Sequence, residues 1–128
     1  MLEFSPEALA QELVHKEPII ISKLGALGYT SSEGYEGIQE LMKFFHLIVK
    51  YDISLTPSVP IDLIWHEFIL FTRTYESFCK KHFGRFIHHQ PDDKQSTNNR
   101  RFKKLISLYE LNFGVLPEKF WLVRESAS

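Results

Sequence analysis

The chain has few of the residues that build covalent or cysteine-metal frameworks. It contains one cysteine, Cys79, among 128 residues, which excludes an internal disulfide and a zinc site made of several cysteines. No apolar run approaches the ~18 residues of a membrane span. The acidic N-terminal residues 1–7 lack the basic-then-apolar order of a signal peptide. We therefore expect a soluble, cytoplasmic protein with no membrane partner.

Glycine is also scarce, and its placement gives no support for a nucleotide-binding loop. None of the six glycines belongs to a G-x-G-x-x-G pattern, and no clear strand precedes the four between positions 25 and 37. We interpret residues 25–37 as a loop-rich connection between helices.

Apolar residues recur at helical spacing along much of the chain. Between residues 35 and 51 they follow one another at intervals of three and four, and a similar face spans residues 98–113. The sequence Ser5-Pro6 is typical of a helix start. The length suits a single core. We predict one compact all-α domain over residues 1–128, built from four or five helices.

The most apolar helical pattern covers residues 60–83. Pro60 suits a first helical turn, Ser58 can cap it, and Gly84 provides a natural end. Apolar side chains fill most of the helix circumference, which is typical of a buried central helix. We predict that four of its aromatic residues are among the least exposed of the chain: Trp65, Phe68, Phe71 and Phe78.

Two ionisable residues interrupt this apolar helix and form the candidate site. Asp62 and His66 are one helical turn apart, so both side chains can reach one ion. The pair His88-His89 follows the helix and can return to meet them. Carboxylate and imidazole ligands suit zinc, iron or manganese. We predict a polar or metal-binding site of Asp62, His66, His88 and His89; the alternative is a buried Asp62–His66 pair with both later histidines at a surface turn.

Cys79 offers a second chemistry. His82 lies one turn later and could act as a base for the thiol. The other interpretation is a buried, inert cysteine. The sequence alone does not decide the role of Cys79 or whether the domain is an enzyme.

Charge is unevenly distributed along a chain whose net charge is −1. Residues 1–72 contain four Lys and Arg against ten Asp and Glu, whereas residues 73–104 contain nine against three. Such asymmetry is consistent with an anionic partner, and the other interpretation is a solvated helix face. The alternative function is therefore a non-catalytic interaction module that binds an acidic protein or a nucleic acid through the basic segment Arg73–Lys104.

One stretch also resembles a known family. It contains an Asp-x-x-Trp-His helix, a later Tyr and a His-containing turn, and it is similar to the glycine-rich domain-containing protein-like family. The resemblance implies a domain and a site without naming a substrate. Phe68 departs from the second His of plant members, and the chain has no glycine-rich region. The residues that carry the resemblance are Ile61-Asp62, Trp65-His66, Ile69-Leu70, Thr72, Tyr75, Cys79, Phe83 to His89 and Pro91.

Overall fold

The computed structural model describes residues 3–89 and 94–121, which contain six helices and no strand. This confirms the all-α prediction, although the helices number six rather than four or five. In the described part of the chain no helix is long and apolar enough to cross a membrane. The helices are α1 (Pro6–Lys16), α2 (Ile19–Gly25), α3 (Ser31–Tyr51), α4 (Val59–Ile69), α5 (Thr72–Phe83) and α6 (Gln95–Phe113).

Three of these helices have a hydroxyl side chain as their N-cap. Ser5 accepts a hydrogen bond from the Ala8 amide at the start of α1, as its position before a proline predicts. Thr30 and Glu33 form a reciprocal capping box at the start of α3. Ser58 caps α4 by accepting from the Ile61 amide, which confirms the predicted cap.

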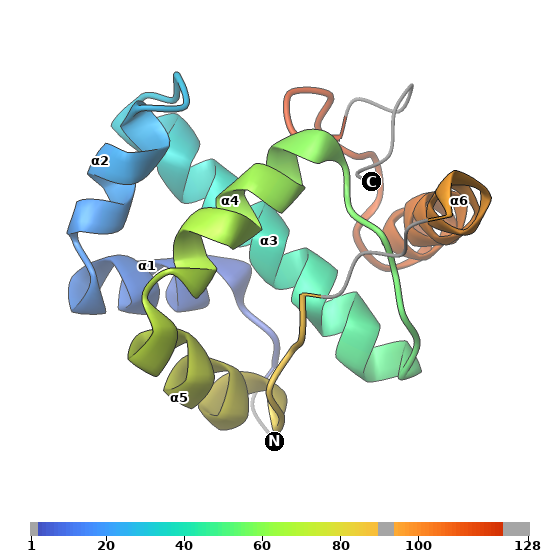
Figure 1. Ribbon diagram of the computed structural model, residues 1–128, viewed down its shortest axis with the longest axis horizontal. Helices are drawn as coiled ribbons and strands as arrows, with labels where there is room; N and C mark the ends of the chain where they lie inside the picture. Colours follow the sequence, from blue (N-terminus) through green and yellow to red (C-terminus); the bar gives the residue numbers. More distant parts are fainter. Residues whose placement is uncertain (1–2, 90–93, 122–128) are drawn as a thin grey trace.

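The central element is α3 rather than the predicted helix over residues 60–83. It is the one helix that packs against all five others, and it runs through the middle of the molecule with α4 across it (Figure 1). Ten of its residues are buried, from Gly34 to Ile48. The interpretation of residues 25–37 as a loop was therefore partly wrong, because α3 begins at Ser31.

Close packing explains why a glycine lies inside the central helix. A Cβ atom built on Gly37 would lie 2.6 Å from Cδ1 of Ile64 and 3.1 Å from the Phe120 ring. A larger residue at this position would force the end of the Ile64 side chain and the Phe120 ring to shift. The same residue type that indicated a loop in the sequence is thus a packing requirement here.

The predicted helix over residues 60–83 is divided into α4 and α5. The helix stops at Ile69, and Phe71 adopts φ −86° and ψ 67°, outside helical geometry, before α5 begins. The change of direction lets Tyr75 and Phe78 of α5 pack edge-on against Phe68 of α4. Phe71 itself is only half-buried, so its predicted place in the core was wrong.

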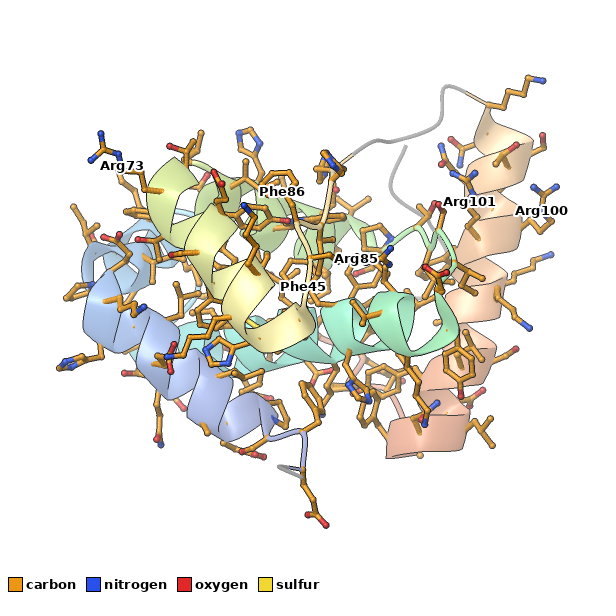
Figure 2. The ribbon with its side chains drawn as sticks, turned by 90° about the horizontal axis from the view of Figure 1, so that it is seen from below. Phe45, Arg73, Arg85, Phe86, Arg100 and Arg101 are labelled. Carbon is orange, nitrogen blue, oxygen red and sulfur yellow. The ribbon has the colours of Figure 1, made fainter. Side chains whose placement is uncertain are left out.

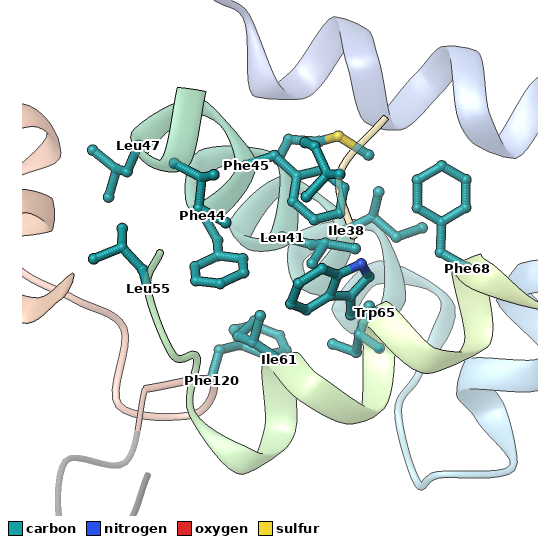
Figure 3. Packing of buried hydrophobic residues seen from close by; sticks show 14 of the residues in the cluster. Ile38, Leu41, Phe44, Phe45, Leu47, Leu55, Ile61, Trp65, Phe68 and Phe120 are labelled. Atoms are coloured by element: carbon teal, nitrogen blue, oxygen red, sulfur yellow. The ribbon is translucent and has the colours of Figure 1, made fainter. Parts of the chain in front are cut away.

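An aromatic cluster between α3, α4 and α5 forms the middle of the core (Figure 3). The Trp65 ring meets Phe44 and Phe45 of α3 edge-on, at centroid distances of 5.3 and 5.4 Å. Trp65, Phe68 and Phe78 are buried as predicted. Each edge-to-face pair of this kind stabilises the fold by about 0.5–1.5 kcal/mol beyond the contribution of the apolar area that it buries.

The C-terminal turn completes the core from the other side. Both the Phe120 and Trp121 amides donate to the Pro117 carbonyl, and both side chains are buried, although no helix forms there. The Ser58 hydroxyl donates to the Phe120 carbonyl over 2.5 Å while it caps α4. One buried hydroxyl therefore positions α4 and the C-terminal turn together.

Candidate functional site

The structure brings Asp62 and His89 together at the partly exposed face of α4. Asp62 lies in the first turn of α4, and its Oδ1 is 2.6 Å from Nε2 of His89. The two side chains are 28% and 25% exposed, so the pair is accessible from solvent. A carboxylate at this distance fixes both the orientation and the tautomer of an imidazole.

The segment that carries His89 is fixed by a relay of hydrogen bonds from the core. Trp65 Nε1 donates to the Tyr75 hydroxyl over 2.9 Å, and that hydroxyl donates to the Ile87 carbonyl over 2.5 Å. The His89 ring also lies edge-on against Trp65, with centroids 4.4 Å apart. Burial raises the pKa of Tyr75, which keeps its hydroxyl protonated as a donor. His89 is therefore held in place from two sides.

His66 and His88 do not join this pair. Both are exposed, and His88 packs instead against the ring of Phe86 at 4.6 Å. Across residues 3–89 and 94–121, no group of three or more His, Cys, Asp or Glu side chains is placed to hold a metal ion. Of the four predicted residues, the structure brings Asp62 and His89 into contact, and exposed His66 forms no buried pair with Asp62.

The Asp62–His89 pair has the chemistry of an oriented imidazole. When Nε2–H donates to Asp62, the neutral ring carries its lone pair on Nδ1. Such a nitrogen can accept a proton or a hydrogen bond from a polar ligand. The fixed ring and the partial exposure of both side chains are what a small polar binding site requires.

Cys79 is buried and is not an activated thiol. Its side chain has no solvent exposure, and burial raises its thiol pKa to about 11. His82, the predicted base, instead places Nε2 at 2.6 Å from Oε2 of Glu12. Because a nucleophilic cysteine needs a lowered pKa, this arrangement favours the inert, structural interpretation.

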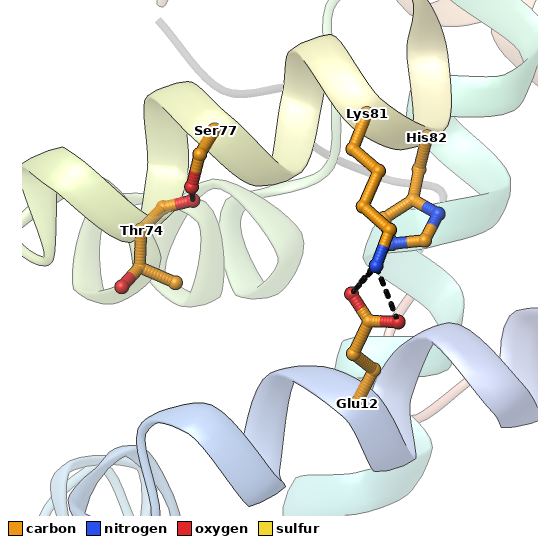
Figure 4. A network of polar contacts seen from close by, with 5 residues as sticks. All are labelled: Glu12, Thr74, Ser77, Lys81 and His82. Atoms are coloured by element: carbon orange, nitrogen blue, oxygen red, sulfur yellow. Dashed lines mark hydrogen bonds and ion pairs between the residues drawn. The ribbon is translucent and has the colours of Figure 1, made fainter.

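The cations of the basic segment Arg73–Lys104 divide into two groups. Most of those in α5 and in the residues directly after it form ion pairs with carboxylates. Lys80 pairs with Glu76, and Lys81 lies with His82 against Glu12 of α1 (Figure 4). Arg85 pairs with Asp52 at 3.2 Å. These side chains mainly attach α5 and the following segment to the rest of the fold.

The cations of α6 are arranged differently. In the described residues no carboxylate lies within ion-pair distance of the four side chains on its second and third turns, Arg100, Arg101, Lys103 and Lys104. Arg100 and Arg101 project from α6 at the opposite end of the molecule from Arg73 (Figure 2). Asp92 and Asp93, which precede this basic turn in the sequence, lie outside the described residues.

A groove forms where α6 faces the loop after α3. Its volume is about 460 Å³, and its lining residues are Ile53, Ser54, Arg100, Arg101 and Lys104. Three cations and a hydroxyl thus surround one open space. No sequence pattern predicts Ile53 and Ser54 as groove residues, because the packing of α6 against α3 brings them there.

Comparison with known proteins corrects the resemblance drawn from the sequence. A model of the family described as UCP032817-like matches residues 26–112, which is more than half of the chain. Nothing indicates the glycine-rich domain-containing protein-like family, so that identification was wrong. Searches of the curated proteins and of the solved structures each found no match.

Proposed function

We propose that this chain, which belongs to the UCP032817-like family, is a non-catalytic module that binds the phosphate backbone of a nucleic acid through α6. The observation that carries the proposal is the groove lined by Arg100, Arg101 and Lys104, whose charges no described carboxylate neutralises. Cations that lie close together repel one another, so an external anion would relieve a local electrostatic cost.

The chemistry of the groove favours phosphate over an acidic protein surface. Arginine presents a planar fork of donors that matches phosphate oxygens, and two of the three lining cations are arginines. Protein interfaces are typically anchored by buried Trp and Tyr together with Arg. Among the residues that the structure describes, Ile53 is the one apolar member of the lining and none of the lining residues is aromatic. Without a stacking platform, contacts would fall on the backbone and be independent of sequence.

Salt dependence provides the test. With three phosphate contacts on duplex DNA, the logarithm of the binding constant should fall with the logarithm of the salt concentration with a slope of about −2.7. Binding should therefore be roughly 40-fold weaker at about 200 mM than at about 50 mM salt. We expect the Arg100→Gln/Arg101→Gln/Lys104→Gln variant to lose at least about tenfold in affinity and most of this slope. A short DNA duplex of mixed sequence, followed by fluorescence anisotropy, is the probe.

A matched control separates the groove from net charge. The variant Lys16→Gln/Lys23→Gln/Lys80→Gln removes the same number of charges from exposed positions on α1, α2 and α5. It should bind nearly as tightly as the unmodified chain. Equal losses in the two variants, or binding to polyglutamate but not to DNA, would overturn the proposal.

The Asp62–His89 pair supports a second candidate function, a site for a small polar ligand. The favouring observation is the 2.6 Å contact between two partly exposed side chains beside Trp65. In this proposal His89 is the side chain that meets the ligand, and Asp62 positions it.

A further inference from the structure

The outer face of α4 carries an exposed apolar stripe. Val59, Leu63 and Leu70 are 41%, 47% and 61% exposed, and exposed His66 lies between the last two. These positions are four, three and four residues apart, so they fall within about 60° of one another on a helix. The stripe follows one face of α4 and its C-cap residue Leu70.

This stripe is not needed for the core of the chain. The opposite side of α4 already packs inward through Ile61, Ile64, Trp65 and Phe68, all of them buried. A helix of a globular protein normally has one apolar face, and the other is polar. A second set of exposed apolar side chains along one face, here with His66 between Leu63 and Leu70, marks a surface that is covered by something else.

The order of residues in the stripe is self-complementary. If a second copy lies antiparallel against it, with the two-fold axis near His66, Leu63 of each copy faces Leu70 of the other. His66 of one copy then lies next to His66 and Glu67 of the second copy. Two-fold contacts between identical patches are the commonest way in which soluble chains associate.

The charges beside the stripe match the same arrangement. Asp62 lies at the N-terminal end of α4, and exposed Arg73 lies just beyond its C-terminal end. In the described residues Arg73 has no carboxylate partner. An antiparallel copy brings each Arg73 toward the Asp62 of the other chain. Leucine pairs and opposite charges therefore favour the same register.

We propose that the chain forms a two-fold symmetric dimer through this face of α4, with a second copy of the chain as the occupant. The stripe is short, so the interface belongs to the small class below about 1,200 Å² that gives weak, reversible association. The proposal is independent of nucleic-acid binding, because α6 contributes nothing to the stripe.

Sedimentation equilibrium across a wide concentration range measures the association. We expect the mass to rise from 15.1 kDa toward twice that value as concentration increases. Leu63→Lys and Leu70→Glu should each remain monomeric. Both positions are exposed, so the substitutions should leave the helical signal unchanged. Leu111→Glu, at a 76% exposed leucine of α6, is the matched control and should still dimerise.

Mixing the two monomeric variants tests the register itself. An antiparallel pair of one Leu63→Lys chain and one Leu70→Glu chain contains a Lys–Glu contact and an intact Leu63–Leu70 contact. The mixture should therefore recover dimers that neither variant forms alone. His66→Cys should also form a disulfide-linked dimer, whereas His88→Cys should not.

Three results would overturn the proposal. One is a monomeric mass for the unmodified chain at every concentration. Another is dimerisation that survives both leucine substitutions, which would place the interface elsewhere. The third is a mixture that stays monomeric although the unmodified chain dimerises, which would contradict the antiparallel register.

Discussion

At the scale of single residues, the Asp62 carboxylate determines where His89 lies. Removing it deletes one hydrogen bond to a partly exposed imidazole, worth about 0.5–1.5 kcal/mol. We expect Asp62→Ala to speed modification of His89 by diethyl pyrocarbonate about two- to tenfold, since the ring leaves its position more often. Mass spectrometry of the modified peptides measures the rate.

A control variant and a contrary outcome complete this test. His66→Ala should leave the His89 rate unchanged, because His66 has no hydrogen bond to the pair within the described residues. An unchanged rate in Asp62→Ala would show that Trp65 alone holds the ring, and it would remove the support for a polar site at Asp62.

The sequence predicted that the His88-His89 segment returns to Asp62 and His66, but not that His89 alone meets Asp62. Ionisable residues on an apolar helix indicated a site, and helical spacing pointed to His66 as the nearest partner of Asp62. The actual partner depends on Tyr75, whose hydroxyl holds the Ile87 carbonyl and so brings the following segment back to α4. Such a return is decided by tertiary packing, which local spacing does not contain.

At the scale of elements, the contact between α1 and α5 depends on pH. The hydrogen bond from His82 has the largest effect and lowers the pKa of Glu12 below its ordinary value of 4.5. Burial has the next largest effect and opposes it, while the charge of His82 and the contact with Lys81 lower the pKa by smaller amounts. A lowered folded-state pKa stabilises the fold above the unfolded-state pKa, and this stabilisation is lost as pH falls through the folded-state value.

We therefore expect Glu12→Gln to reduce the free energy of unfolding by about 0.2–1 kcal/mol at pH 7, the range for partly exposed ion pairs. The difference from the unmodified chain should vanish in acid, below the ordinary carboxyl range. Urea unfolding at several pH values measures it. Glu76→Gln breaks a more exposed pair with Lys80 and serves as control; an equal pH effect in both variants would contradict a special role for Glu12.

The break between α4 and α5 shows why the sequence pattern alone does not predict every helix boundary. Neither Leu70 nor Phe71 is a helix-breaking residue, so the sequence predicts a continuous helix there. The break instead follows from packing, since Tyr75 and Phe78 must turn toward Phe68. The start of α4 was predictable, because a capping serine and a proline in the first turn favour a helix start through local contacts alone.

At the scale of the whole molecule, α6 and the C-terminal turn are joined to the central helix by one buried carboxylate. Glu40 of α3 is 4% exposed, and Tyr109 of α6 and Trp121 both donate to its Oε1, over 2.5 and 2.8 Å. Lys43 pairs with its other oxygen at 2.9 Å. Burial, together with the Glu40 carboxylate, raises the pKa of Tyr109, so its hydroxyl stays a donor. The helix that carries the proposed groove is thus fixed through Glu40.

We expect Glu40→Ala to lower the free energy of unfolding by about 3 kcal/mol or more, because two buried donors and a cation lose their acceptor together. The loss of stability should also differ between helices. Since α6 packs mainly against α3, hydrogen exchange should accelerate in α6 before it does in α1 and α2. Glu36→Ala, on the exposed side of the same helix, should cost less than about 0.5 kcal/mol and leave that pattern unchanged. Uniform acceleration across all helices would show that Glu40 stabilises the entire core rather than the attachment of α6.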